Sequence, residues 1–152
     1  MEIEPLSQWR EWIPQLARWH HAQWEVYNPG QTLAKRVALL ELEAVDGDLP
    51  LAWVARDGDE LLGSASLVES DLELRPEMKP WLASVFVAPE HRQRGIGGAL
   101  VRFIAAQARE RGFPAIYLYT PDQMRFYERL GWSEIEKVAY HGDQITLMRQ
   151  VF

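Results

Sequence analysis

Near the middle of the chain stands the sequence Val87-Ala88-Pro89-Glu90-His91-Arg92-Gln93-Arg94-Gly95-Ile96-Gly97-Gly98-Ala99-Leu100. The apolar run that precedes it, residues 81–87, predicts a strand. Apolar residues recur at helical spacing from its end onward: Leu100, Val101, Ile104, Ala105 and Ala108. The glycines therefore lie between a strand and the beginning of a helix.

A junction of this kind favours binding of an anion. The first N–H groups of a helix have no partner within the helix, and the helix dipole is positive there. Glycine has no Cβ, so a ligand can approach the backbone closely. Arg92 and Arg94 add positive charge. The junction predicts a phosphate or pyrophosphate site; the alternative is an ordinary glycine-rich turn with two solvated arginines.

The spacing of the glycines and arginines discriminates between nucleotide-binding motifs. A Walker loop requires Gly-Lys-Ser/Thr, which is absent, and a dinucleotide fingerprint requires a third glycine where the chain has Leu100. By contrast, Arg92-x-x-Gly95-x-Gly97, preceded by Val87-x-Pro89-Glu90, resembles the coenzyme A pyrophosphate loop of the GNAT superfamily of N-acetyltransferases.

Composition limits the classes of function. With 152 residues, of which 47% are hydrophobic, the chain is expected to form a single domain spanning residues 1–152. It contains no cysteine, which excludes disulfides, thiolate metal sites and a cysteine acyl-enzyme. A net charge of −6 argues against broad nucleic-acid binding and allows attraction of cationic substrates.

No signal peptide and no run of about 18 apolar residues is recognisable, so we expect a cytoplasmic protein without a membrane span. No metal is expected either. His20 and His21 are adjacent and point to different helix faces, and the 57–59 segment lacks the ligand pattern of a calcium loop. The sequence leaves the oligomeric state open, with a homodimer as one option.

Periodicity and turn residues predict an α/β fold with a mixed central sheet. The expected strands are residues 2–4, 51–56, 61–68, 81–87, 115–119, 133–140 and 144–151. Helices are expected at 13–24, at 33–44, from the glycine loop to about 111, and from 120–122 to 130. The first two helices could cover one side of the sheet and could also form a wall of an acceptor site.

This order of elements is similar to the GNAT fold over residues 51–148, with helices flanking the sheet. A second motif supports the resemblance: Phe126-Tyr127-Glu128-Arg129-Leu130-Gly131-Trp132 resembles the family's Tyr-x-x-x-Gly-Phe, with Trp in place of Phe. One position departs from the pattern. Many relatives have Asn in the turn seven residues before that Tyr, where this chain has Thr120 followed by Pro121.

The resemblance implies an acetyl-CoA-dependent N-acetyltransferase in which a primary amine attacks the thioester directly in a ternary complex. It assigns backbone contacts with the pantetheine arm to the strand residues Val85, Phe86 and Val87, with one N–H able to polarise the thioester carbonyl. It assigns the pyrophosphate to the loop residues Arg92, Gln93, Arg94, Gly95, Ile96, Gly97 and Gly98. Tyr127 becomes the candidate general acid for the CoA thiolate, the alternative being a packing residue.

The general base stays open at this level. The strand 81–87 carries no carboxylate. Candidates for the base elsewhere are Glu69, Asp71, Glu73, Tyr140 and His141. The alternative for each of them is a solvated loop residue without a catalytic role. The acidic segment 69–77 and the hairpin around 140–143 predict a negatively charged cleft mouth suited to a cationic amine.

Two other functions compete with this interpretation. A non-catalytic acyl-CoA-binding or sensing domain would keep the loop but would not need Tyr127. A nucleotide-binding regulatory module would need the lysine or the third glycine that the loop lacks.

Overall fold

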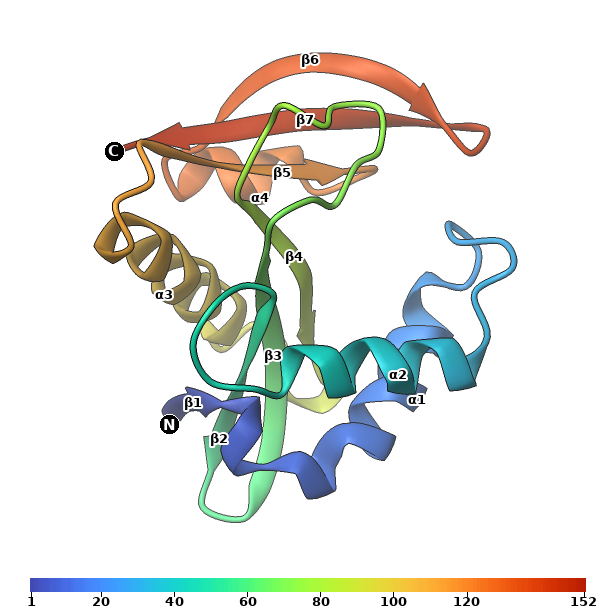
Figure 1. Cartoon of the computed structure of the whole chain (residues 1–152), viewed down its shortest axis with the longest axis vertical. Helices are drawn as coiled ribbons and strands as arrows, with labels where there is room; N and C mark the ends of the chain where they lie inside the picture. Colours follow the sequence, from blue (N-terminus) through green and yellow to red (C-terminus); the bar gives the residue numbers. More distant parts are fainter.

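Seven strands form one mixed sheet in the computed structural model, which describes residues 1–152 (Figure 1). The strands are β1 (Glu2–Pro5), β2 (Leu51–Asp57), β3 (Glu60–Val68), β4 (Trp81–Val87), β5 (Ala115–Thr120), β6 (Ser133–Tyr140) and β7 (Asp143–Val151). Their order in the sheet is β1-β2-β3-β4-β5-β7-β6. Only β4 and β5 are parallel neighbours, since every other pair is antiparallel. The mixed α/β architecture expected from the sequence is confirmed.

Helices cover both faces of the sheet. They are α1 (Ile13–Trp24), α2 (Leu33–Glu43), α3 (Ile96–Glu110) and α4 (Met124–Arg129), with short 3₁₀ turns η1 (Leu6–Gln8), η2 (Arg10–Trp12) and η3 (Pro89–His91). Figure 1 shows α3 on one side of β3 and β4, and the α1–α2 pair on the other side. None of the helices combines the length and apolar character that crossing a bilayer requires.

Alternation along β2 explains the two layers. Successive side chains of a strand point to opposite faces. Leu51, Trp53 and Ala55 pack in the cluster that contains the buried face of α3. Ala52 and Val54 pack in a separate cluster with α1 and α2. The first two helices therefore cover one face of the sheet, as one of the two sequence interpretations proposed.

The sheet opens between β4 and β5. Pairing of these strands is confined to Trp81 and Tyr117, next to a hydrogen bond from the Tyr117 N–H to the Pro80 carbonyl (3.0 Å). On its other edge β4 stays paired with β3 as far as Val87. The β4 edge beyond Trp81 is consequently free of strand pairing on the β5 side, and the split creates space in the middle of the sheet.

Candidate active site

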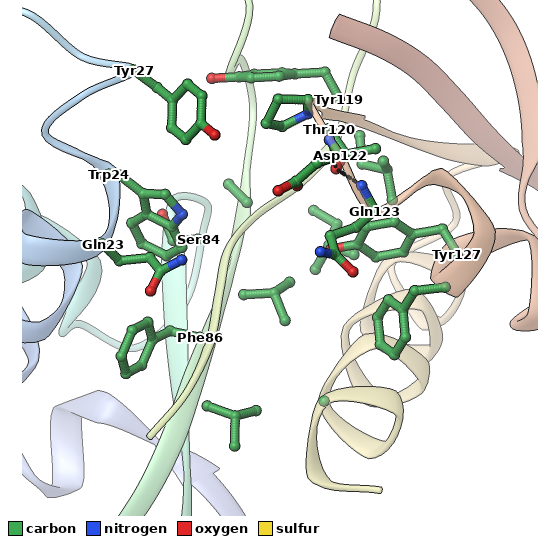
Figure 2. A pocket seen from close by; sticks show the side chains of 18 of the residues that line it. Gln23, Trp24, Tyr27, Ser84, Phe86, Tyr119, Thr120, Asp122, Gln123 and Tyr127 are labelled. Carbon is green, nitrogen blue, oxygen red and sulfur yellow. Dashed lines mark hydrogen bonds between the residues drawn. The ribbon is translucent and has the colours of Figure 1, made fainter. Parts of the chain in front are cut away.

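A cavity of about 930 Å³ lies at this split. It is lined by residues of α1, β4, the loop before α3, the end of β5 and α4. Figure 2 shows Gln23, Trp24 and Tyr27 on one wall and Gln123 and Tyr127 on the opposite wall. A volume of this size is at the upper end of the range typical of sites for small molecules and cofactors.

The three predicted strand residues Val85, Phe86 and Val87 all line the cavity. The Phe86 ring packs against Trp19 and Trp24 of α1, with ring centroids 5.6 and 6.0 Å apart. This packing turns the Phe86 side chain toward α1. The split leaves the backbone of these residues without a β5 partner, as the family's pantetheine contacts would require.

The loop before α3 reverses direction with left-handed backbone at Gln93 (φ 64°) and Gly95 (φ 79°), and α3 begins at Ile96. All predicted loop residues except Arg94 line the cavity. A Cβ added at Gly97 would lie 3.5 Å from Phe126 and 3.7 Å from Val87, and all three residues line the cavity. The N–H groups of the first turn of α3 have no helical partner, which suits the diphosphate of a coenzyme A.

The two arginines of the loop have different roles. Arg92 donates from Nε to the Val87 carbonyl (2.9 Å) and from Nη2 to Gln23 (3.3 Å), at the cavity edge. The Arg94 guanidinium instead donates to Nδ1 of buried His91 (2.9 Å), and His91 Nε2 lies 3.2 Å from Glu60. Arg94 thus ties the loop to the start of β3, a contact that no local sequence pattern signals.

Tyr127 is half-buried on α4 and lines the cavity. Its ring contacts Phe126 and Trp132 edge to face, at centroid distances of 5.0 and 6.1 Å. Burial, followed by the negative charge of Asp122, raises the pKa of the Tyr127 phenol above its ordinary value. The phenol therefore stays protonated at neutral pH and can act as a hydrogen-bond donor.

Thr120 lies at the end of β5, is buried and lines the cavity. Its Oγ1 accepts a hydrogen bond from the Gln123 N–H (2.9 Å). The side chain that stands where relatives have Asn is therefore engaged in shaping the turn into α4.

A buried polar network that the sequence analysis missed joins α1 and α2 to β4. Arg36 donates from Nη2 to Ser84 Oγ (2.8 Å) and from Nε to His20 Nδ1 (3.1 Å). His20 Nε2 lies 2.9 Å from Ser64 Oγ. Because burial and then the Arg36 charge lower the His20 pKa well below its ordinary value, the ring is neutral, accepting at Nδ1 and donating at Nε2.

Among the candidate bases, only Asp71 and Tyr140 line the cavity, whereas Glu69, Glu73 and His141 are exposed outside it. Burial raises the pKa of the Asp71 carboxyl to about 7; the negative charge of Glu43 also raises it, and Arg36 partly offsets the rise. No sequence pattern distinguishes Asp71 from its acidic neighbours. No three His, Asp or Glu side chains are grouped as a metal site would require.

Comparison with known proteins agrees with this geometry. The model of the acetyltransferase (GNAT) family matches residues 10–132. Human N-acetyltransferase 8 is 30% identical over 86 residues, which are 54% of this chain and 38% of that protein, so the chain spans well under half of that relative.

Two solved structures share the fold. The ribosomal-protein-alanine N-acetyltransferase from Brucella melitensis superposes with a TM-score of 0.79 at 20% identity, covering 100% of both chains. An aminoglycoside 6'-N-acetyltransferase complexed with coenzyme A superposes with a TM-score of 0.77 at 17% identity, covering 99% of this chain and 97% of that one.

The chain therefore belongs to the GNAT acetyltransferase family. Family and fold are confirmed as the sequence predicted them. Two solved structures that share this fold contain coenzyme A or acetyl-CoA.

Proposed function

We propose that this protein transfers the acetyl group of acetyl-CoA directly to a primary amine while both substrates are bound. The observation that carries the proposal is the split between β4 and β5, which joins the loop before α3, the free edge of β4 and Tyr127 in one cavity. Those are the places where the family's donor contacts were expected, and they line one cavity.

Donor binding would involve two kinds of contact. The N–H groups at the beginning of α3 and the Arg92 guanidinium would hold the pyrophosphate, since both supply positive potential at the cavity edge. The free backbone edge of Val85, Phe86 and Val87 would pair with the amide groups of the pantetheine arm. Arg94 would contribute through its backbone, because its guanidinium is bound to His91.

Tyr127 would assist departure of the CoA sulfur. Its raised pKa keeps the proton on the phenol until the C–S bond breaks. The same burial raises the proton affinity of a thiolate formed beside it, so the proton can pass from oxygen to sulfur. Since the chain has no cysteine, the amine nitrogen must attack the thioester without a thiol intermediary.

The acceptor would enter from the side of α1 and the 69–77 loop. The names of the Brucella and aminoglycoside enzymes both specify N-acetylation, which supports an amine here. A net charge of −6 and the cavity carboxylates Asp71, Asp122 and Asp143 favour a cationic acceptor. The cytoplasmic location and the oligomeric state remain predictions.

A thiol-release assay with acetyl-CoA tests the proposal. The panel should hold spermidine, phenethylamine, kanamycin and a peptide with an N-terminal alanine, with N-acetyl-glutamate as an acceptor that lacks a free amine. Amine-dependent release with an N-acetylated product is expected. If acetyl-CoA binds but no amine stimulates release, the alternative of a non-catalytic acyl-CoA-binding or sensing domain replaces the enzyme.

A further inference from the structure

Two carboxylates and one guanidinium influence one another's charge on the proposed acceptor side of the cavity. Glu43 and Arg36 come from α2 and are 2% and 6% exposed. Asp71 comes from the segment after β3 and lines the cavity, as Arg36 does. The Arg36 charge lowers the pKa of both carboxyls, and the Glu43 charge raises the pKa of Asp71, so the three charges interact electrostatically. With both carboxylates ionised this group carries one net negative charge.

The hydrogen bonds of the group leave Asp71 free. Glu43 Oε1 accepts from Ser66 Oγ at 2.6 Å. Arg36 is committed to Ser84 and His20. The Asp71 carboxylate accepts no hydrogen bond from the protein, although the residue is partly buried and lines the cavity. A shielded carboxylate in this position has lone pairs available for a donor brought by a ligand.

Aromatic rings complete the surroundings. Tyr119 from β5 and Tyr140 from β6 pack edge to face with centroids 5.9 Å apart, and both line the cavity beside Asp71. Trp24 and Tyr27 lie on the α1 wall (Figure 2). Aromatic faces attract cations and supply apolar contact for the carbon atoms next to an ammonium group.

We propose that Asp71 binds the ammonium group of the acceptor and is the general base that removes its proton. This proposal rests on the proposed function. The Asp71 carboxylate takes one proton from R–NH₃⁺, leaving R–NH₂ and a neutral carboxyl. The nitrogen lone pair forms the C–N bond while the C–S bond breaks and its electron pair goes to sulfur. The departing sulfur takes the proton of the Tyr127 hydroxyl. After the C–N bond has formed, the nitrogen loses its second proton, and solvent returns a proton to the Tyr127 oxygen.

Glu43 and Arg36 help to bring the pKa of Asp71 into the range that suits a general base. A base works best when its pKa lies near the working pH, and burial and Glu43 raise the Asp71 value to about 7 while Arg36 limits the rise. The groups facing Asp71 are Glu43 and Arg36 from α2, Tyr119 from β5 and Tyr140 from β6. The expected acceptor is therefore an alkylammonium with apolar carbon beside nitrogen and no adjacent carboxylate.

The first arm of the test is the pH dependence of kcat/KM for phenethylamine in wild type, Asp71→Asn and the control Glu77→Gln, which removes an exposed charge from the same segment. Wild type and control should show an acidic limb with a midpoint near pH 7. Asp71→Asn should fall about 10²- to 10⁴-fold at pH 7, lose that limb and recover toward high pH, where solution supplies free amine. Its acetyl-CoA affinity should be unchanged.

The second arm needs no turnover. The ¹³C signal of the Asp71 carboxyl, identified by its absence from Asp71→Asn, should shift when n-butylammonium is added at pH 8, and its titration midpoint should fall. An unshifted signal, or a wild-type pH profile in Asp71→Asn, overturns the role of Asp71. Failure of every amine to turn over despite a shifted signal would instead overturn the proposed acetyl transfer, while the signal would support ammonium binding.

Discussion

Asp71→Asn should lose less stability than wild type as the pH rises from 5 to 8. An acid whose folded-state pKa lies above its unfolded value holds its proton more tightly in the folded state. Stability then falls as pH rises from the unfolded pKa to the folded pKa, because the unfolded chain ionises first. Asp71 has an ordinary value of 3.8 and a folded value of about 7, so the wild type loses stability across this range. Asparagine cannot ionise, so the variant does not show this decrease in stability.

The magnitude follows from the interval between two experimental conditions. From pH 5 to pH 8 the folded wild type passes its Asp71 pKa of about 7 while the unfolded chain is already ionised at pH 5. Two pH units at about 1.36 kcal/mol each give a loss of about 3 kcal/mol in wild type that the variant escapes. Any effect of the amide itself is the same at both pH values and cancels in the comparison.

Urea unfolding at pH 5 and pH 8 measures this difference directly, and Glu77→Gln serves as the matched control because its side chain is exposed. The stability of Asp71→Asn relative to wild type should increase by about 3 kcal/mol between the two conditions, whereas that of Glu77→Gln should stay constant. Equal pH dependence in wild type and Asp71→Asn would refute the buried, charge-coupled environment assigned to Asp71.

Three further substitutions probe the rest of the site. Gly97→Asp has room for its Cβ and suits the start of a helix, so the fold should persist while calorimetry shows at least about 10-fold weaker acetyl-CoA binding, a loss of about 1.4 kcal/mol; equal affinity would remove the loop from the donor site. Tyr127→Phe keeps the ring and should lower kcat about 10- to 10⁴-fold with little change in KM for acetyl-CoA, and an unchanged kcat in a chemistry-limited reaction would exclude Tyr127 as the acid. Arg36→Met removes the cation that offsets the charges of buried Glu43 and partly buried Asp71, and it should cost about 3–5 kcal/mol of stability at pH 7 by urea unfolding; a neutral effect would contradict its charge-balancing role.

Local sequence signals were sufficient for the fold and for most of the cavity lining contributed by β4 and the loop before α3. The strand of residues 81–87, the glycines and the following amphipathic helix each follow from patterns within a few residues. The structure places α3 at Ile96 after the left-handed Gly95, and Gly131 ends the Tyr127 segment with φ 94°. Turn residues and periodicity encode such features directly, which explains the agreement.

The acceptor side could not be predicted in the same way because its residues meet only through tertiary packing. Arg36 and Glu43 look like solvated charges on the second helix, yet both are buried where α2 crosses the sheet. Ser84 has a left-handed backbone (φ 56°) beside an irregularity in the β3–β4 register, and its hydroxyl accepts a hydrogen bond from Arg36, a partner distant in the sequence. Asp71 is partly buried and lines the cavity, whereas Glu69 and Glu73 are exposed, and only the tertiary structure separates them.

The most direct test of acetyl transfer in this cavity uses acetyl-CoA labelled in its acetyl group, with phenethylamine as acceptor, and compares wild type with Gly97→Asp at subsaturating donor. Wild type should convert the label into N-acetyl-phenethylamine, with one CoA thiol released per amide formed and no labelled protein when the amine is left out. Gly97→Asp should form the product far more slowly. Label that accumulates on the protein, or product formation at the same rate in both proteins, would contradict direct transfer from a donor held at the beginning of α3.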